Sequence, residues 1–190
     1  QSIYECEYNQ ELYEIIIVDD SSTENLDWMI ECELPNVEII KQKINKGSGF
    51  CRNLGVSHSK YDIILFLDAD ATISKNTLAQ IDKAIRIEGY DGLNSQMNDI
   101  PINDGIYSKL EAANKSTVIG KLPPVHRHMS FCLGALTKKV FMKYGGCYHR
   151  HLDDYEFMTN LPNTVRIKQD NKVIHSHNFS DYKGILKKYF

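Results

Sequence analysis

The pattern of apolar and polar positions gives the first picture of the chain. Apolar residues run without a break over 63–67, and the run stops on Asp68 and Asp70, which small Ala69 separates. A continuous apolar run of this length is typical of a strand that is covered on both faces, as in the sheets of α/β proteins. The segment 61–70 is therefore predicted to hold a strand that is covered on both faces and ends in two carboxylates.

The remainder of the N-terminal half alternates between strand-like and helix-like segments. Two further strands are predicted, a buried one at 13–18 and a short one at 37–41. Helices are predicted near 26–32, over 51–56 after a glycine-rich turn, and from a Ser74 cap to Gly89. Residues 1–10 are read as the tail of a helix that runs into a loop. This order predicts βαβ units and a largely parallel sheet.

The C-terminal half carries weaker signals. Between 91 and 128 Gly, Asn, Asp and Pro recur, and we interpret this stretch as a variable part that shapes a substrate pocket. The segments with a clearer pattern are predicted strands at 129–136 and 172–175, and predicted helices at 107–114, 138–143, from Asp153, and at 182–190.

Composition bounds the class of protein. The chain has 190 residues, 42% hydrophobic and 25% charged, which is typical of one soluble globular domain. A net charge of −3 gives no electrostatic case for nucleic acid as a partner. No apolar stretch reaches the roughly 20 residues that span a bilayer. The five cysteines never form a CxxC pair, which favours reduced thiols in a cytosol.

The acids that follow the predicted strands are the first candidates for a functional site. If the extended geometry persists past 67, Asp68 and Asp70 point the same way and can hold a hard divalent cation that carries a phosphate group. The alternative is that both acids cap the following helix. Asp19 and Asp20 likewise follow the strand at 13–18, with turn formation as their alternative role.

Four motifs stand in a recognisable order: VDDSS at 18–22, GSGFCRN at 47–53, LDAD at 67–70 and GGCYHRHLDDYEF at 145–157. The set resembles the family 2 glycosyltransferases of the nucleotide-sugar-binding GT-A fold. Members of that family show VDDGS, a Gly-x-x-x-Arg-Asn element, a DxD and a GGFDE…ED block in the same order. The tail VIHSHNFSDYKGILKKYF is similar to rhamnosyltransferase-like members.

This resemblance implies an α/β fold of the GT-A type, with a mixed, mostly parallel sheet flanked by helices. It implies one catalytic domain over 1–190, with a nucleotide-binding half at 1–90 and an acceptor-binding half at 91–190. It also implies that the chain is a fragment, because the family begins with a strand that lies between those at 13–18 and 61–67. We therefore expect residues before Gln1, and a last helix that continues past Phe190.

The implied activity is inverting transfer of a hexosyl or deoxyhexosyl group from a nucleotide-diphospho-sugar, UDP- or dTDP-linked. The implied acceptor is a hydroxyl group of a glycan or a lipid-linked acceptor. The implied cofactor is Mn²⁺ or Mg²⁺, since a divalent cation offsets the charge that grows on the departing diphosphate. The setting is polysaccharide assembly in a cytoplasm, with peripheral association at the inner face of the cell membrane as a further expectation.

The motif match assigns the general base to Asp154, the second acid of the pair with Asp153. Asp153 stands where the family usually has Glu. A general base is needed because the acceptor hydroxyl loses its proton as it attacks. Acids at a helix N-terminus are the alternative reading of the pair.

The match assigns nucleotide-sugar binding to Asp19, Asp20, Arg52 and Asp68, with a solvated helix-face charge as the alternative for Arg52. It assigns the metal to Asp68, Asp70 and a late histidine. His175 fits that place best and His177 is the alternative, because imidazole suits Mn²⁺.

Three rival functions remain open. His149, His151 and Asp153 form HxHxD, which is similar to metallo-β-lactamase-like enzymes, but Asp154 stands where their closing histidine belongs. A degenerate domain that binds a sugar nucleotide without catalysis is the second rival. A nucleotidyltransferase is the third, and it leaves the DDYEF block without a role.

Overall fold

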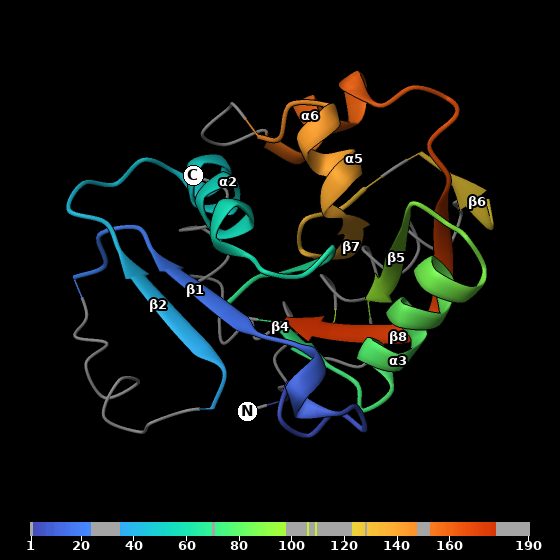
Figure 1. Ribbon diagram of the computed structural model, residues 1–190, viewed down its shortest axis with the longest axis horizontal. Coiled ribbons are helices and arrows are strands. Elements are labelled where there is room, and N and C mark those ends of the chain that lie inside the picture. Colours follow the sequence, from blue (N-terminus) through green and yellow to red (C-terminus); the bar gives the residue numbers. More distant parts are fainter. Residues whose placement is uncertain are drawn as a thin grey trace. The chain divides into compact units, whose positions relative to one another are not determined.

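The structure is a computed structural model, and it describes residues 2–23, 35–69, 71–97, 106, 109, 123–127, 129–147 and 153–177. For residues 96–97, 133, 153–154 and 171–177 the description covers the backbone. Figure 1 shows the helices and strands of these segments. No helix in the described segments is long and apolar enough to cross a membrane.

A two-stranded parallel sheet carries the first acid motif. Strand β1 (Ile15–Asp19) pairs with β2 (Val37–Lys41), from Ile15 opposite Val37 to Asp19 opposite Lys41. Both strands and the helix that follows them were predicted, and are confirmed. The expectation that β1 is fully buried is wrong: all five of its residues are partly exposed, because β2 is its one partner among the described residues.

Helix α2 (Ser48–His58) packs against this small sheet. The packing is close because Gly55 has no side chain: a Cβ there lies 3.6 Å from Cγ2 of Val18. The N-terminus of α2 follows Gly47, whose φ of 90° few other residues adopt without strain.

The other sheet is mixed and has six strands, in the order β3-β7-β5-β8-β4 with β6 also paired to β8. Strand β8 pairs in parallel with β5 and antiparallel with β4 and β6, so the sheet is mixed and is not the largely parallel sheet that was predicted. The strands are β3 (Ile63–Leu67), β4 (Ala71–Ile73), β5 (Gly92–Met97), β6 (Val125–His126), β7 (Leu133–Thr137) and β8 (Ile167–His177).

Sequence patterns missed or shortened several of these strands. β5 lies inside the stretch interpreted as variable, because its interior residues Asn94 and Ser95 are polar although both are buried. β8 covers 11 residues rather than the predicted 172–175, since most of it is polar. β4 was not predicted at all, because three residues are too few to show alternation.

The helices agree better with the sequence. Helix α3 (Thr77–Asp82) continues as the wider turn η2 (Lys83–Ile87) and stops before Gly89, as predicted. Ser74 does not cap it: the Ser74 hydroxyl donates to Asn76 Oδ1 at 2.8 Å, and the helix starts three residues later. Helix α5 (Lys138–Lys143) has the predicted bounds, and α6 (Asp153–Asn160) begins at the predicted residue.

The N-terminal residues form turns and the short helix η1 (Gln10–Leu12), so the predicted helical tail at 1–10 is wrong. The predicted helix at 26–32 lies outside the described residues. So does the one at 182–190, and so does most of the one at 107–114. Within the described segments β1 pairs with β2 and β3 with β7, not with each other, and the expectation of a strand before Gln1 stays a prediction.

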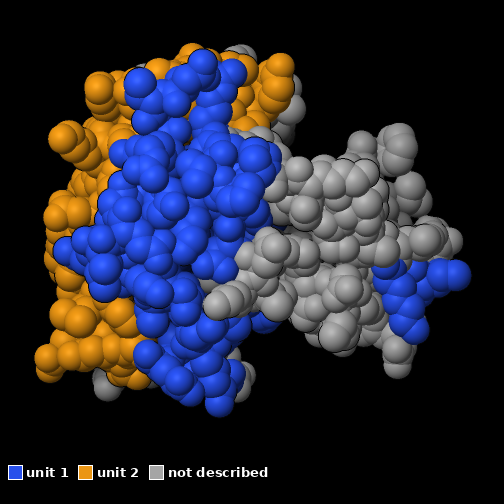
Figure 2. Space-filling view, turned by 90° about the vertical axis from the view of Figure 1, so that its right-hand side faces the viewer, with its two compact units in different colours: residues 1–7, 65–135, 163–190 blue, residues 8–64, 136–162 orange. Residues whose placement is uncertain are grey.

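The chain divides into two compact units, coloured separately in Figure 2. Unit 1 comprises residues 1–7, 65–135 and 163–190, and its core includes an edge-to-face pair, Phe66 and Phe131, with centroids 4.6 Å apart. Unit 2 comprises residues 8–64 and 136–162, and Phe141 of α5 packs on Phe157 of α6 at 5.3 Å. The division into halves at residue 90 stays a prediction.

Candidate functional site

The acids after β1 bind backbone groups. The carboxylate of Asp20 accepts from the backbone N–H of Lys46 and of Gly47, both at 2.7 Å. Asp19 accepts from the N–H of Ser22 at 2.9 Å. Asp20 thus brings a negative charge from the end of β1 to the N-terminus of α2, where the helix dipole favours it. A carboxylate has about four acceptor positions, so these bonds leave it chemically able to accept more.

Cys51 in the first turn of α2 contacts the same carboxylate. Burial, and then the charge of Asp20 and a hydrogen bond to it, raise the pKa of the Cys51 thiol from 9.0 to about 11. The positive charge of Arg52 opposes part of this rise. The thiol is therefore protonated at neutral pH, which makes Cys51 a weak nucleophile.

Asn53, the residue after Arg52, makes contacts that sequence reasoning missed. Its Oδ1 accepts from the N–H of Cys147 at 2.8 Å, and its Nδ2 donates to the carbonyl of Cys147 at 2.5 Å. The turn at Gly145 and Gly146 precedes this contact, with φ values of 93° and 69°. The sole signal in the sequence was the Asn of GSGFCRN and the paired glycines of the last motif, which directly precede Cys147, 94 residues after Asn53.

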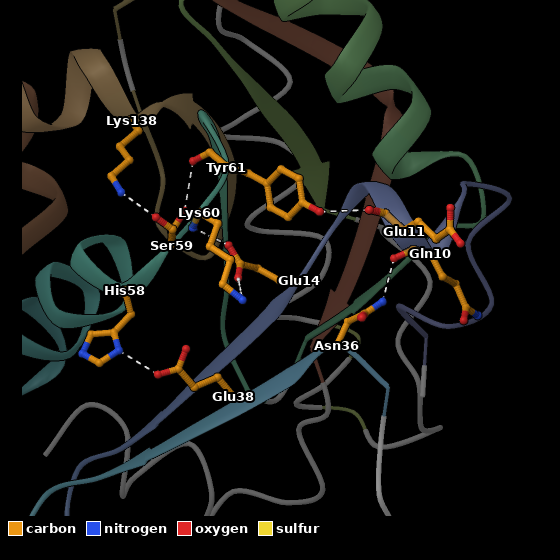
Figure 3. A network of polar contacts seen from close by, with 10 residues as sticks. All are labelled: Gln10, Glu11, Glu14, Asn36, Glu38, His58, Ser59, Lys60, Tyr61 and Lys138. Atoms are coloured by element: carbon orange, nitrogen blue, oxygen red, sulfur yellow. Dashed lines mark hydrogen bonds and ion pairs between the residues drawn. The ribbon is translucent and has the colours of Figure 1, made fainter.

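The opposite end of α2 is held by a network of polar contacts drawn in Figure 3. Lys138 Nζ donates to the carbonyl of Ser59 at 2.6 Å, and the N–H of Lys60 donates to Glu14 at 2.6 Å. Nδ1 of His58 lies 2.7 Å from Oε1 of Glu38 on β2. These contacts, all within unit 2, fix the direction of α2 relative to β1 and α5.

The second acid motif follows β3 and is held by its main chain. The N–H of Asp68 donates to the carbonyl of Cys132 at 3.2 Å, and the N–H of Ala71 donates to the carbonyl of Asp68 at 3.0 Å. The chain therefore turns after 67, and the premise that extended geometry persists to Asp70 is wrong. Asp70 itself lies outside the described residues.

A buried asparagine supports this turn from β5. Asn94 is 2% exposed, and its Oδ1 accepts from the N–H of Ser130 at 3.0 Å. Gly134 lets the chain approach, because a Cβ there lies 3.0 Å from that oxygen and 2.3 Å from the carbonyl of Ser130. The segment that binds the Asp68 N–H is thus fixed by a polar core residue that apolar patterns cannot reveal.

The backbone register of β8 bears on the late histidines. His177 pairs with Ala71, directly after Asp70, whereas His175 pairs with Ile73. Both histidines therefore lie on the strand beside β4, and His177 is two residues nearer to the acid turn. Their side chains lie outside what the structure describes.

Asp153 and Asp154 begin α6, and the structure describes their backbone only. Phe157, which is fully buried, holds the helix against Phe141. An acid in the first turn of a helix is consistent with the capping alternative as well as with a base.

The predicted site residues fall into two sets. Asp19, Asp20, Arg52 and Asp154 belong to unit 2, and Asp68, Asp70 and His175 belong to unit 1. No group of three or more metal-binding side chains occurs among the described residues. The donors proposed for a metal, carboxylate oxygens with one imidazole, match the preference of Mn²⁺ or Mg²⁺ in kind. The strand that carries the late histidines, β8, pairs with β4, which begins directly after Asp70 in the sequence.

Residues 3–145 match the family model described as Glycosyl transferase family 2. An uncharacterized glycosyltransferase of Haemophilus influenzae is 29% identical over 168 residues, which is 78% of this chain and 52% of that protein. The glycosyltransferase SunS of Bacillus subtilis is 34% identical over 74 residues, 39% of this chain and 18% of that protein.

Solved structures show the same fold. S. aureus TarS 1–349 in complex with UDP-GlcNAc has a TM-score of 0.73 at 18% identity and covers 100% of this chain. The mannosyltransferase PcManGT of Pyrobaculum calidifontis, in complex with GDP-Man and Mn²⁺, has a TM-score of 0.71 at 19% identity and covers 93%. This chain spans 56% and 50% of those two chains. The α/β architecture predicted from the sequence is therefore confirmed as GT-A.

Proposed function

Since the chain belongs to glycosyl transferase family 2, we propose that it transfers a sugar from a nucleotide-diphospho-sugar to a hydroxyl acceptor with inversion and with the help of a divalent metal. The family match over 3–145 carries this proposal. The nucleotide sugars in the TarS and PcManGT structures, and the Mn²⁺ in the latter, support it. The hexosyl or deoxyhexosyl group, a glycan or lipid-linked acceptor, and polysaccharide assembly at a cytoplasmic membrane face belong to the same proposal.

In the proposed reaction Asp154 accepts the proton of the acceptor hydroxyl as that oxygen attacks the anomeric carbon. The bond from this carbon to the diphosphate oxygen breaks at the same time, and the nucleoside diphosphate leaves. A Mn²⁺ or Mg²⁺ ion held at the site would supply Lewis-acid chemistry for the departing diphosphate. Asp68, Asp70 and His175 are the proposed metal residues, with His177 as the alternative because its backbone lies nearer to the acid turn.

Asp19, Asp20 and Arg52 are the proposed contacts of the nucleotide. Asp20 already fixes the N-terminus of α2, so in this proposal one carboxylate both shapes the loop at Lys46 and Gly47 and faces the donor. Asp68 joins them as the residue between nucleotide and metal.

The first test is a panel of UDP, dTDP and GDP with and without Mn²⁺, followed by thermal unfolding. We expect stabilisation by at least one nucleotide only when metal is present. Turnover with the matching donors is then measured as nucleoside diphosphate released. Stabilisation without turnover favours the non-catalytic rival, and release of pyrophosphate favours a nucleotidyltransferase.

The second test addresses the base. Asp154→Asn is expected to keep nucleotide binding and to lose transfer by at least ~100-fold, the usual range for a removed acid–base group. Asp153→Asn is the matched control from the same helical turn and is expected to lose less. The reverse order of damage contradicts the assignment of the base.

A further inference from the structure

The contact between Asn53 and the backbone around Cys147 joins two motifs that are far apart in the chain. Asn53 lies in the middle of α2, and both ends of its carboxamide are used, one as acceptor for the Cys147 N–H and one as donor to the Cys147 carbonyl. Cys147 is 2% exposed. Such sheltered, paired hydrogen bonds fix the direction of a backbone segment as well as its distance.

Gly146 is fitted to the same contact. A Cβ at Gly146 lies 2.5 Å from Oδ1 of Asn53 and 3.1 Å from Cε1 of Phe141, and its φ of 69° disfavours a side chain independently. The backbone can approach the carboxamide only because position 146 has no side chain. The glycine and the asparagine therefore form one device, which we name the Asn53 clamp (Asn53, Gly146 and Cys147).

The clamp lies at the start of the segment that leads to the proposed base. Five residues separate Cys147 from Asp153, where α6 begins. Beyond that first turn, Phe157 packs on Phe141 of α5, the helix that precedes the glycine turn. The first turn of α6 is thus set between two fixed points of unit 2, and the clamp is the one that connects to α2.

The clamp also connects to the residues that are proposed to bind the nucleotide. Asn53 follows Arg52 in the sequence, and the N-terminus of the same helix is bound by the carboxylate of Asp20. Helix α2 thus connects the acid turn of β1 with the backbone of Cys147, which precedes Asp153 and Asp154 in the chain. A displacement of about 1 Å at a reacting group can lower a rate about 100-fold, so such a connection matters for chemistry.

We propose that Asn53 is a positioning residue for glycosyl transfer: it sets the segment that carries Asp154 relative to the helix that carries Arg52. Asn53 acts through the backbone at 146–147 and contacts no reacting atom in this proposal. The inference rests on the proposed function, in which Asp154 is the base.

The test compares Asn53→Ala with Asn36→Ala in the full chain. Asn36 is a matched control, because it lies in the same unit and its Nδ2 donates to a backbone carbonyl, that of Gln10, at 2.7 Å. For Asn53→Ala we expect kcat to fall at least ~10-fold, with the dissociation constant of the nucleoside diphosphate and Mn²⁺ unchanged within about twofold. For Asn36→Ala we expect a loss of stability with kcat unchanged within about twofold.

Amide hydrogen exchange at residues 145–147 measures whether the clamp is formed, and this measurement does not require turnover. Exchange there should accelerate in Asn53→Ala and not in Asn36→Ala, since the N–H of Cys147 loses its acceptor. If Asn53→Ala does not fold, Gly146→Ala serves instead, because it disturbs the same contact from the other side. Where both fold, the double variant should lose no more kcat than the worse single variant, within about twofold.

Unchanged kcat in a folded Asn53→Ala variant overturns the inference and leaves the proposed function standing. An equal loss of nucleotide binding and kcat also overturns it, because the damage then lies in α2. Failure of the wild-type chain to turn over any donor contradicts the proposed function instead, and the exchange result still decides whether the clamp exists.

Discussion

Acids stand at the ends of both β1 and β3, but their carboxylates differ in the backbone groups that they are seen to bind. After β1 the side chains organise the backbone: the Asp20 carboxylate binds the N–H groups of Lys46 and Gly47. After β3 the backbone organises the turn: the Asp68 N–H and carbonyl are bound by Cys132 and Ala71. The first motif therefore anchors the N-terminus of α2 through a carboxylate, whereas after β3 main-chain groups bind both the N–H and the carbonyl of Asp68.

This difference shows that one short pattern, a strand followed by two acids, can have two physical meanings. An acid that stabilises a helix N-terminus contributes to folding, and its removal weakens the unit. An acid whose turn is also held by main-chain hydrogen bonds is expected to contribute less to folding than Asp20 does. Four predictions test or refine this contrast.

The largest expected effect is on ligand binding at the β3 turn. Asp70→Asn and Asp68→Asn should each abolish the metal-dependent stabilisation by a nucleoside diphosphate, which is about 2.7 kcal/mol at 100 times the dissociation constant. The free energy of unfolding without ligand is the control, because a substitution that acts on the metal site alone leaves it nearly unchanged. Thermal unfolding with and without Mn²⁺ measures both, and an unchanged metal-dependent shift removes these acids from the site.

The next effect is on the stability of unit 2. Asp20→Ala should lower the free energy of unfolding by about 2 kcal/mol, because two hydrogen bonds from backbone N–H groups to a charged acceptor are lost. Urea unfolding measures it, with Asp68→Ala as the matched control. Equal losses in the two variants contradict the contrast between the two acid turns.

A third prediction concerns pH. The folded chain holds the Cys51 proton more tightly than the unfolded chain, because burial and Asp20 raise the pKa of this thiol to about 11. Its contribution to stability is therefore complete below pH 9.0 and is lost as pH rises toward 11. Between pH 8 and pH 10.5, the free energy of unfolding should fall by more in the wild-type chain than in the Cys51→Ala variant.

The variant Asp20→Asn tests how much of the rise in the pKa of Cys51 is due to Asp20. It removes the charge that acts on Cys51 but leaves the burial, so the extra loss of stability at high pH should shrink without vanishing. An unchanged loss in Asp20→Asn shows that burial alone sets the pKa of Cys51.

The smallest effect is expected at the far end of α2. Glu38→Gln should cost less than about 0.5 kcal/mol, because Glu38 and His58 form a pair whose side chains are 43% and 41% exposed. Urea unfolding near pH 6 provides the measurement. A loss as large as that of Asp20→Ala shows that an acid near α2 stabilises it wherever it lies, and that the anchoring role of Asp20 is not special.

The sequence alone determined the elements whose stability is local or strongly patterned. The apolar run at 63–67, the strand at 37–41 and the helix at 138–143 appear at their predicted residues. The expectation that the strand at 63–67 is covered on both faces is wrong, since Phe66 is the one buried residue of its five and β3 stands at the end of the strand order among the described residues. The four motifs indicated the family because they stand in the same order along the chain as in its members. A site that is assembled from the ends of several strands keeps its residues in such a fixed order. The roles of Asp154, Asp70 and His175 were inferred from that order and stay predictions.

Only the tertiary structure decided what depends on distant partners. Strand β5 and most of β8 are polar segments that become strands because they pair with each other, from Gly92 opposite Ile167 onward. Asn94 and Asn53 acquire their roles from backbone groups brought to them from 36 and 94 residues away. Hydrogen bonds of this kind follow no periodicity in the sequence, because they depend on which distant segments the fold brings together. The residues near each partner carry no local signal of that contact.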